Sequence, residues 1–218
     1  MGAALFDLDR TLLDCNSGRL WVAHEWRQGR IGWRDAAWAS WWLARYTLGM
    51  AEGMEDVFEI AVASFEGVEE ELVKQRTQAW FDDECASRLR PGAAEALEKH
   101  RAAGDRLVLA TSSTLYSALA AQKLWGFDDL VCTRLEVRDG RFTGRISGLA
   151  YGEAKLERVR EWAREHAVDL GDCTFYTDSI TDLSVMEAVG APVAVNPDVK
   201  LSRLASARSW PTVDWGRG

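Results

Sequence analysis

Two aspartates separated by one residue follow a short apolar run near the start of the chain. Ala3–Phe6 contains four apolar residues, Asp7 and Asp9 come next, and a hydroxyl follows at Thr11. Such a run predicts a strand that is buried on both faces. The carboxylates would then lie at its carboxyl end, which is the edge of an open α/β sheet where ligands bind. Taken alone, the pair is equally typical of a solvated strand end that begins a turn.

Polar side chains also follow two later apolar runs, which the same pattern identifies as strands. The run at 106–110 ends in three hydroxyls: Thr111, Ser112 and Ser113. The run at 173–177 ends at Asp178, and Asp182 follows one helical turn further on. Lys155 begins a predicted helix between these two strands. Each residue alone could be a helix cap or a solvated charge, but their recurrence at one sheet edge predicts a site.

The strand-end aspartates would need a counter-charge. Asp7, Asp9 and Asp178 brought together would raise one another's pKa unless a cation neutralised them. Mg²⁺ prefers a few carboxylates together with water and substrate phosphate. Lys155 and the Thr111 hydroxyl would hold the other phosphate oxygens. One carboxylate could then attack phosphorus while its neighbour moves the proton, which predicts phosphate chemistry through an aspartyl phosphate.

Alternating strands and helices after residue 90 predict the fold that positions these residues. Strands are expected at 106–110, 130–137, 141–147, 173–177 and 191–195, and helices at 93–103, up to Trp125, at 153–166 and at 180–189. Asp139-Gly140 between two extended runs is typical of a β-hairpin. This order predicts an α/β fold with a Rossmann-like, mostly parallel sheet, helices on both faces, a small hairpin flap, and 191–195 as its last buried strand.

The segment between the first two strands is built differently. It shows no strand pattern, and four helices are expected, at 17–28, 33–48, 54–65 and 69–80. Short glycine-containing loops between them predict a helical bundle. We therefore expect a helical cap domain at 15–88 and a core domain at 1–14 and 89–218. Seven of the eleven tryptophans lie between residues 21 and 80, either as bundle core or as the lining of a substrate cleft.

Composition limits the partners. The 218 residues carry a net charge of -8 and no long basic run, so neither nucleic acid nor stable membrane insertion is expected. Four scattered cysteines without a C-x-x-C pair, and no signal-peptide pattern, favour a cytoplasmic location. The expected partner is a small molecule, and the sequence does not indicate an oligomeric state.

The ordered motifs resemble those of the haloacid dehalogenase-like phosphatases. D-L-D-R-T at 7–11, the hydroxyl-ended strand at Thr111, Lys155, and D-S-I-T-D at 178–182 match the family's four motifs in order and spacing. The cap after the first motif and the D-G-R-F-T-G run at 139–144 resemble the phosphoserine-phosphatase-like branch, subfamily IB. The A-V-N-P-D run at 194–198 also resembles that branch.

This resemblance implies the catalytic and metal-binding roles. Asp7 would be the nucleophile and a Mg²⁺ ligand. Asp9 would be the general acid and base, and would ligate the metal through its backbone carbonyl. Asp178 would complete the metal site.

The resemblance also implies the residues that bind phosphate or support the site. Thr111, Ser112 and Lys155 would hold the phosphoryl group, and Lys155 would also steady the nucleophile. Asp182 would support the metal site or Lys155, and Thr11 would be a further supporting residue. The implied activity is Mg²⁺-dependent hydrolysis of a small phosphomonoester such as phosphoserine or histidinol phosphate.

Two positions depart from the family pattern. Arg10 stands where a small residue is usual, and Asn16 stands where phosphoserine phosphatases place a glutamate that meets the substrate's ammonium group. Asp14 or Glu25 could take that glutamate's place.

Two alternative functions are compatible with the same residue types. A phosphoacceptor signalling domain also combines strand-end acids, a hydroxyl and a lysine, but it needs neither the long helical insert nor the last two aspartates. A catalytically silent binding module of the same fold is the other alternative, although every expected catalytic position is filled.

Overall fold

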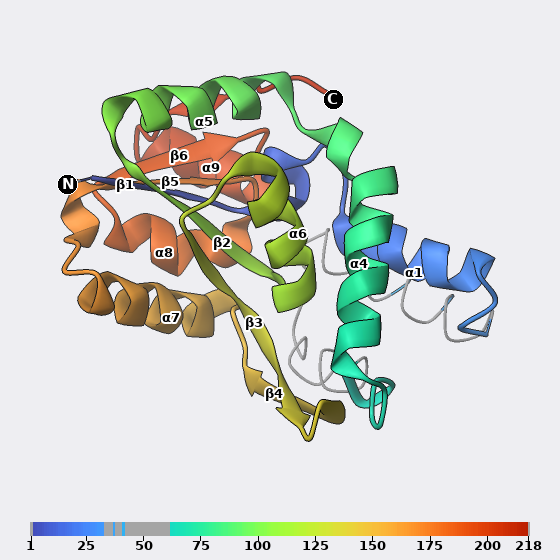
Figure 1. Ribbon diagram of the computed structural model, residues 1–218. Helices are drawn as coiled ribbons and strands as arrows, with labels where there is room; N and C mark the ends of the chain where they lie inside the picture. The colour runs from blue at the N-terminus through green and yellow to red at the C-terminus, as the bar shows by residue number, and fades with distance from the viewer. Residues whose placement is uncertain (1, 33–36, 38–40, 42–61, 218) are drawn as a thin grey trace.

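The computed structural model describes residues 2–32, 37, 41 and 62–217. Within them the strands form one seven-stranded sheet in the order β4-β3-β2-β1-β5-β6-β7, with β1 at its centre (Figure 1). The strands are β1 (Ala3–Phe6), β2 (Arg106–Thr114), β3 (Asp129–Arg138), β4 (Arg141–Gly148), β5 (Cys173–Thr177), β6 (Ala191–Val195) and β7 (Thr212–Val213). Each neighbouring pair is parallel except β3 and β4, which form an antiparallel hairpin. The predicted mostly parallel α/β sheet is confirmed.

Helices cover both faces of the sheet. The described α-helices are α1 (Ser17–Arg27), α4 (Glu70–Glu84), α5 (Pro91–Ala103), α6 (Leu115–Trp125), α7 (Gly152–Glu165), α8 (Leu183–Ala188) and α9 (Val199–Ala207). In Figure 1, α5 lies above the sheet, and α7 and α8 lie below it. None of these helices has the length and apolar character needed to span a membrane.

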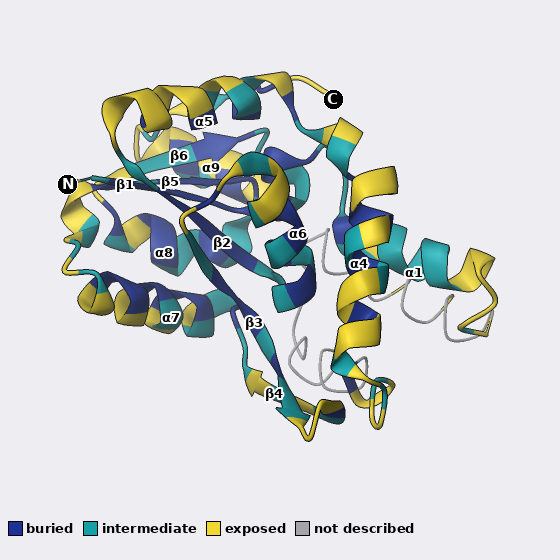
Figure 2. Ribbon diagram, in the orientation of Figure 1, coloured by how far each residue is buried: buried dark blue, intermediate teal, exposed yellow. Residues whose placement is uncertain are grey.

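The central strand explains why both faces need cover. Alternate residues of a strand point to opposite faces, and Ala4 and Phe6 accordingly belong to the core beneath α5 and α6. Ala3 and Leu5 belong to the second core, which α7, α8 and α9 complete. Figure 2 shows the buried residues concentrated in the strands and on the helix faces that pack against them.

Two boundaries predicted after residue 90 are wrong by three or more residues. The strand expected at 106–110 continues to Thr114, because β2 bulges past Ala110 and then pairs with β3 again. The helix expected at 180–189 begins as a 3₁₀ turn, Ile180–Asp182, before α8. The run at 191–195 is the last strand with buried residues, but α9 and the short strand β7, whose two residues are not buried, follow it. The Asp198 carboxylate accepts hydrogen bonds from two backbone amides of α9 and so starts that helix.

The described part of the segment 15–88 contains two of the predicted helices. Asn16 caps α1 by accepting a hydrogen bond from the Arg19 amide at 2.9 Å. Along α4, Trp80 is 2% exposed and its ring packs edge-on against Trp21 at 5.1 Å. These two tryptophans therefore have the packing role that bundle core requires. Apart from residues 37 and 41, the predicted helix 33–48 lies outside the described residues, and so does the predicted helix 54–65 up to residue 61. Three tryptophans lie there as well: Trp33, Trp38 and Trp42.

The ends of this segment meet beside β1. The Arg90 amide donates to the Leu12 carbonyl at 2.8 Å, and the Asp14 amide donates to the Arg88 carbonyl at 3.1 Å. Between them, Leu13 and Leu89 form an antiparallel bridge. The chain thus leaves and re-enters the sheet region through two hydrogen-bonded segments, while the division into domains stays a prediction.

Candidate active site

The first carboxylate sits at the carboxyl end of β1. The backbone amide of Asp7 donates to the Tyr176 carbonyl of β5 at 2.9 Å, which extends the parallel pairing by one residue. The Asp7 side chain is buried, and its Oδ1 lies 3.2 Å from the Lys155 Nζ. The predicted position of this residue at the sheet edge is therefore correct.

A tight turn, Leu8–Leu12, follows Asp7 and turns the next carboxylate toward another part of the site. Asp9 is partly buried; its Oδ1 accepts from the Ser17 amide at 2.6 Å and its Oδ2 accepts from the Ser113 hydroxyl at 3.2 Å. Arg10 occupies the turn at φ +62°, a left-handed backbone conformation that favours glycine. The resemblance expects a small residue there, and this geometry supplies a physical reason for one.

Lys155 forms the centre of a buried ion cluster. It projects from the first turns of α7, is 2% exposed, and lies 2.6 Å from Asp182 Oδ1 as well as close to Asp7. Burial alone would lower the pKa of the ammonium, but Asp182 and Asp7 outweigh this effect and raise its pKa. The other oxygen of Asp182 accepts from the Thr177 hydroxyl at 2.7 Å. Of the two supporting roles expected for Asp182, the structure shows the contact with Lys155.

Asp178 lies at the carboxyl end of β5 and is buried. Its Oδ1 is 3.4 Å from the Thr11 hydroxyl, which donates to it, and its Oδ2 is 3.6 Å from the Arg10 Nε. Burial and the nearby Asp7 carboxylate raise the pKa of Asp178, and the Arg10 guanidinium opposes that rise. Thr11 and Arg10 thus converge on the aspartate that was predicted as a metal ligand.

The predicted phosphate-binding hydroxyls lie on the arched part of β2. Thr111 is fully buried, and its Oγ1 accepts from the Ser113 amide at 3.1 Å. The Ser112 carbonyl accepts from the Thr133 hydroxyl at 2.8 Å. The first of these hydrogen bonds lies within the arch, the second joins it to β3, and the one from Ser113 to Asp9 joins it to the turn after β1.

The site holds an excess of negative charge. Four carboxylates belong to it: Asp7, Asp9, Asp178 and Asp182. The nearby cations are the buried Lys155 and Arg10, whose side chain is 43% exposed. Burial raises the pKa of Asp7 to about 7, with Lys155 opposing the rise and the Asp182 and Asp9 carboxylates adding to it. Oxygen ligands with this excess charge suit a hard divalent cation.

The Asp9 carboxylate also has a raised pKa. Burial is the main cause, and the hydrogen bonds from Ser17 and Ser113 work against it. Within the described residues, no three or more histidine, cysteine, aspartate or glutamate side chains surround one position that a metal could take. Because the Asp9 carboxylate faces the two serines and Asp182 faces Lys155 and Thr177, Asp7 and Asp178 are the carboxylates left to meet a cation.

Sequence reasoning missed four hydroxyl residues around the site: Ser17, Ser113, Thr133 and Thr177. Ser17 is visible in the sequence only as a residue beside a helix cap, and Ser113 only as the third hydroxyl in a row. Thr133 and Thr177 lie inside strands, where a β-branched residue is ordinary. Their roles depend on tertiary contacts that the pattern does not encode.

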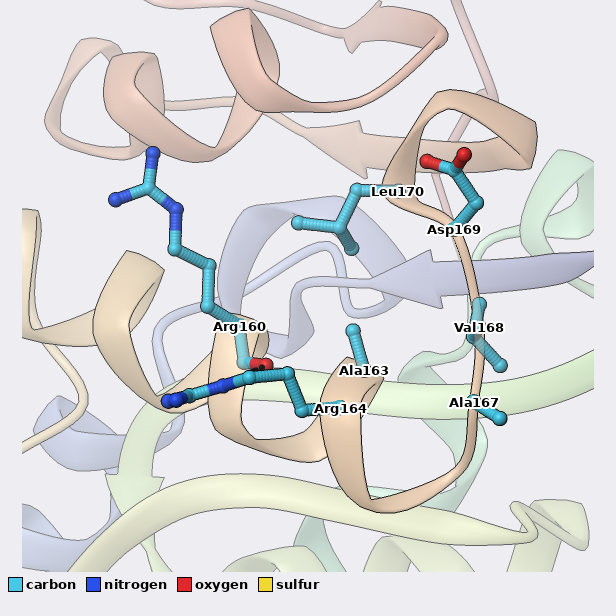
Figure 3. Close-up of a pocket in the computed structure, with 7 residues that line it drawn as sticks. All are labelled: Arg160, Ala163, Arg164, Ala167, Val168, Asp169 and Leu170. Atoms are coloured by element: carbon cyan, nitrogen blue, oxygen red, sulfur yellow. Dashed lines mark hydrogen bonds between the residues drawn. The ribbon is translucent and has the colours of Figure 1, made fainter.

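A surface hollow of about 770 Å³ lies elsewhere, beside the second half of α7 and the loop that leads to β5 (Figure 3). Its lining residues are Arg160, Ala163, Arg164, Ala167, Val168, Asp169 and Leu170. None of them is a predicted site residue. The convergence of carboxylates and Lys155 therefore identifies the candidate site better than the shape of this hollow does.

Comparison with known families gives the context of this geometry. The family model of the haloacid dehalogenase-like hydrolases matches residues 4–187. This range includes all of the predicted site residues. The chain belongs to this family. A histidinol-phosphatase from Neisseria meningitidis is 27% identical over 97% of this chain and 98% of its own length. The predictions of the family and of a phosphatase are confirmed.

Further relatives of the chain extend over almost all of it. The inhibition of morphological differentiation protein of Streptomyces azureus is 34% identical over 99% of this chain and 79% of its own length. A crystal structure of a protein with unknown function from Bordetella pertussis has a TM-score of 0.88 and 31% identity, and 99% of each chain is covered. A solved phosphoserine phosphatase has a TM-score of 0.67 at 18% identity, which shows a shared fold.

Proposed function

We propose that this phosphatase hydrolyses a small organic phosphomonoester with the help of Mg²⁺ and through an aspartyl phosphate on Asp7. The observation that carries the proposal is the buried contact of Asp7 with Lys155 at the carboxyl end of the central strand, 3.2 Å between Oδ1 and Nζ. A carboxylate held there by an ammonium is fixed in place and remains available as a nucleophile. Lys155 is fixed in turn by Asp182.

The side chains divide the reaction between them. A carboxylate oxygen of Asp7 attacks phosphorus, the ester P–O bond breaks, and the departing alcohol takes a proton from Asp9. In the second step Asp9 takes a proton from water, whose oxygen attacks phosphorus and frees Asp7 and inorganic phosphate. The raised pKa of Asp9 suits a group that must carry a proton in one half-reaction and accept one in the other.

The remaining predicted residues would bind the phosphoryl group or Mg²⁺. Thr111, Ser112 and Lys155 would hold the phosphoryl oxygens by hydrogen bonds and charge. Asp7, Asp178 and the backbone carbonyl of Asp9 would hold Mg²⁺, which supplies positive charge next to the phosphoryl group. The surplus of buried carboxylates described above supports this assignment.

The substrate class is narrower than a general phosphomonoester. We propose an amino-acid or amino-alcohol phosphate such as phosphoserine or histidinol phosphate, which the similarity to a histidinol-phosphatase supports. Asn16 caps α1, and the two acids that could replace the missing glutamate both face arginines. Glu25 lies 2.7 Å from Arg30, and Asp14 lies 3.7 Å from Arg88. These pairings engage both acids, which weighs against phosphoserine within the proposed class.

The cellular location, the kind of substrate and the domain division are also part of the proposal. Four free cysteines support a reducing, cytoplasmic location, and the net charge of -8 supports a small-molecule substrate over nucleic acid. We also propose that 15–88 forms a helical cap on a core of 1–14 and 89–218. The paired ends of this segment beside β1 support that division.

Phosphate release tests the proposal. The protein should hydrolyse p-nitrophenyl phosphate with Mg²⁺, lose activity in EDTA and regain it with added Mg²⁺. The Asp7→Asn variant should show no turnover, and activity retained in that variant would sink the mechanism. A panel of amino-acid, histidinol, sugar, nucleotide and lipid phosphomonoesters would then identify the substrate class. An aspartyl phosphate that survives desalting without turnover would favour a phosphoacceptor instead.

A further inference from the structure

The strand that carries the predicted phosphate-binding hydroxyls departs from its neighbour where those hydroxyls begin. Ala110 of β2 pairs with Val131 of β3, and the next paired residues are Thr114 and Thr133. Four steps along β2 therefore match two steps along β3. Residues 111–113, which stand opposite the single residue 132 of β3, form an arch that leaves the ladder. The arch brings the Ser113 hydroxyl within 3.2 Å of the Asp9 carboxylate.

One side chain of β3 spans the gap below the arch. Thr133 is fully buried. Its hydroxyl donates to the Ser112 carbonyl at 2.8 Å and accepts from the Ala150 amide at 3.2 Å. A side chain thus replaces the backbone pairing that the bulge interrupts, as buried backbone groups require.

The second partner of this hydroxyl leads to the other half of the site. Ala150 directly precedes Tyr151, whose carbonyl accepts from the Lys155 amide at 3.3 Å in the first turn of α7. Lys155 then reaches Asp7 from that turn. A single hydroxyl therefore lies between the arch of β2 and the segment that starts α7.

We propose that Thr133 is a positioning residue of the active site, whose hydroxyl fixes the phosphate-binding arch of β2 relative to the start of α7 and its lysine. The proposal rests on the proposed function, because Thr111 and Lys155 must hold the same phosphoryl group. Thr133 is buried behind both elements and acts through them. Loss of its hydroxyl would free the arch from α7 and spread the positions of the groups that bind phosphate.

The experiment compares two substitutions at this position in the full-length protein. Thr133→Val keeps the volume and removes both hydrogen bonds, whereas Thr133→Ser keeps the hydroxyl. With p-nitrophenyl phosphate and Mg²⁺, Thr133→Val should lower kcat/KM about tenfold and weaken product inhibition by inorganic phosphate by a similar factor, as the loss of one buried hydrogen bond would. Thr133→Ser should stay within about threefold of the wild type.

A matched control comes from the flap. Thr143 on β4 donates to the Glu136 carboxylate at 2.6 Å, away from the arch, so Thr143→Val should leave both kinetic parameters unchanged. Thermal melts establish that every variant is folded at the assay temperature. Unchanged kinetics in Thr133→Val, or equal impairment in Thr133→Ser, would overturn the proposal.

Hydrogen exchange separates this proposal from the proposed function. In Thr133→Val, peptides covering 109–116 and 148–155 should exchange faster than in Thr133→Ser, whether or not the protein turns over substrate. A wild-type protein that releases no phosphate from any substrate would refute the proposed function. Unchanged exchange in both peptides would refute the role of Thr133 independently.

Discussion

Replacing Asp7 by asparagine should stabilise the metal-free protein at pH 8, although it removes the proposed nucleophile. Burial raises the pKa of Asp7 from 3.8 to about 7. When folding raises the pKa of a carboxyl group, the folded state binds the proton more tightly than the unfolded state does. The folded state is therefore most favoured at pH values below the unfolded pKa, and this advantage is lost as the pH rises through the folded pKa. At 1.36 kcal/mol per pKa unit, the ionised carboxylate costs the metal-free fold up to roughly 4 kcal/mol at pH 8.

The pH dependence distinguishes this effect from a general change in packing. At pH 5 the ionised Asp7 carboxylate destabilises the metal-free fold by only part of that amount. The stability advantage of Asp7→Asn over the wild type should therefore grow by up to roughly 3 kcal/mol between pH 5 and pH 8. Lys155 keeps its 2.6 Å contact with Asp182 in the variant. Urea unfolding in EDTA, followed by circular dichroism at both pH values, measures the difference.

A carboxylate outside the site provides the control. Asp172 is exposed, and Asp172→Asn should show the pH dependence of the wild type. Added Mg²⁺ at pH 8 should stabilise the wild type more than Asp7→Asn, because the variant lacks one of the proposed ligands. An Asp7→Asn advantage that is absent, or equal at pH 5 and pH 8, would refute the reasoning about the buried charge.

Three further substitutions test contacts of the same structure. Lys155→Met leaves two buried carboxylates without their cation and should lower the free energy of unfolding by roughly 3–5 kcal/mol; a loss below about 1 kcal/mol in urea would contradict the ion cluster. Tyr176→Phe removes the hydroxyl that lies 2.8 Å from His100 Nε2 and should lower the free energy of unfolding, measured in a thermal melt, by about 1 kcal/mol. An unchanged melt would show that this hydrogen bond makes no net contribution to stability. Ala167 has a φ of +52°, so Ala167→Gly should gain about 1 kcal/mol in urea unfolding, and a less stable variant would contradict the strain.

The strand ends are the part of the site that the sequence predicts well. Asp7 and Asp178 each follow an apolar run that is buried on both faces, and a charged residue after such a run marks the sheet edge. Lys155 is predicted less directly, since only its order among the motifs connects it with the two aspartates. The parallel sheet then brings the three together without further information from the sequence.

The contacts that orient Asp9 are not predictable in the same way. They depend on Ser113, which the bulge in β2 moves out of the ladder, and on Ser17, which the turn after β1 brings back. A run of hydroxyls does not reveal where a strand arches, because strand propensity depends on the neighbours against which each side chain packs. The position of the arch is determined by how β2 pairs with β3 in the folded protein.

The missed helix α9 is a different kind of error. Asp198 is a good helix cap, and Leu201, Leu204 and Ala205 recur at the spacing of an amphipathic helix. The sequence carries this helix signal, although no helix is predicted after 191–195. The two-residue strand β7 has no comparable signal, since it is defined by its pairing with β6 alone.

The hydrogen-bonded pair at Leu12–Asp14 and Arg88–Arg90 has an evolutionary consequence. Opposite residues of an antiparallel pair lie about 5 Å apart, a distance that a two-residue turn can close. The chain between the two paired segments can therefore lengthen, shorten or be exchanged without moving β1 or α5. An exchanged segment that keeps Ser17, whose amide holds Asp9, would leave the proposed catalytic carboxylates in place.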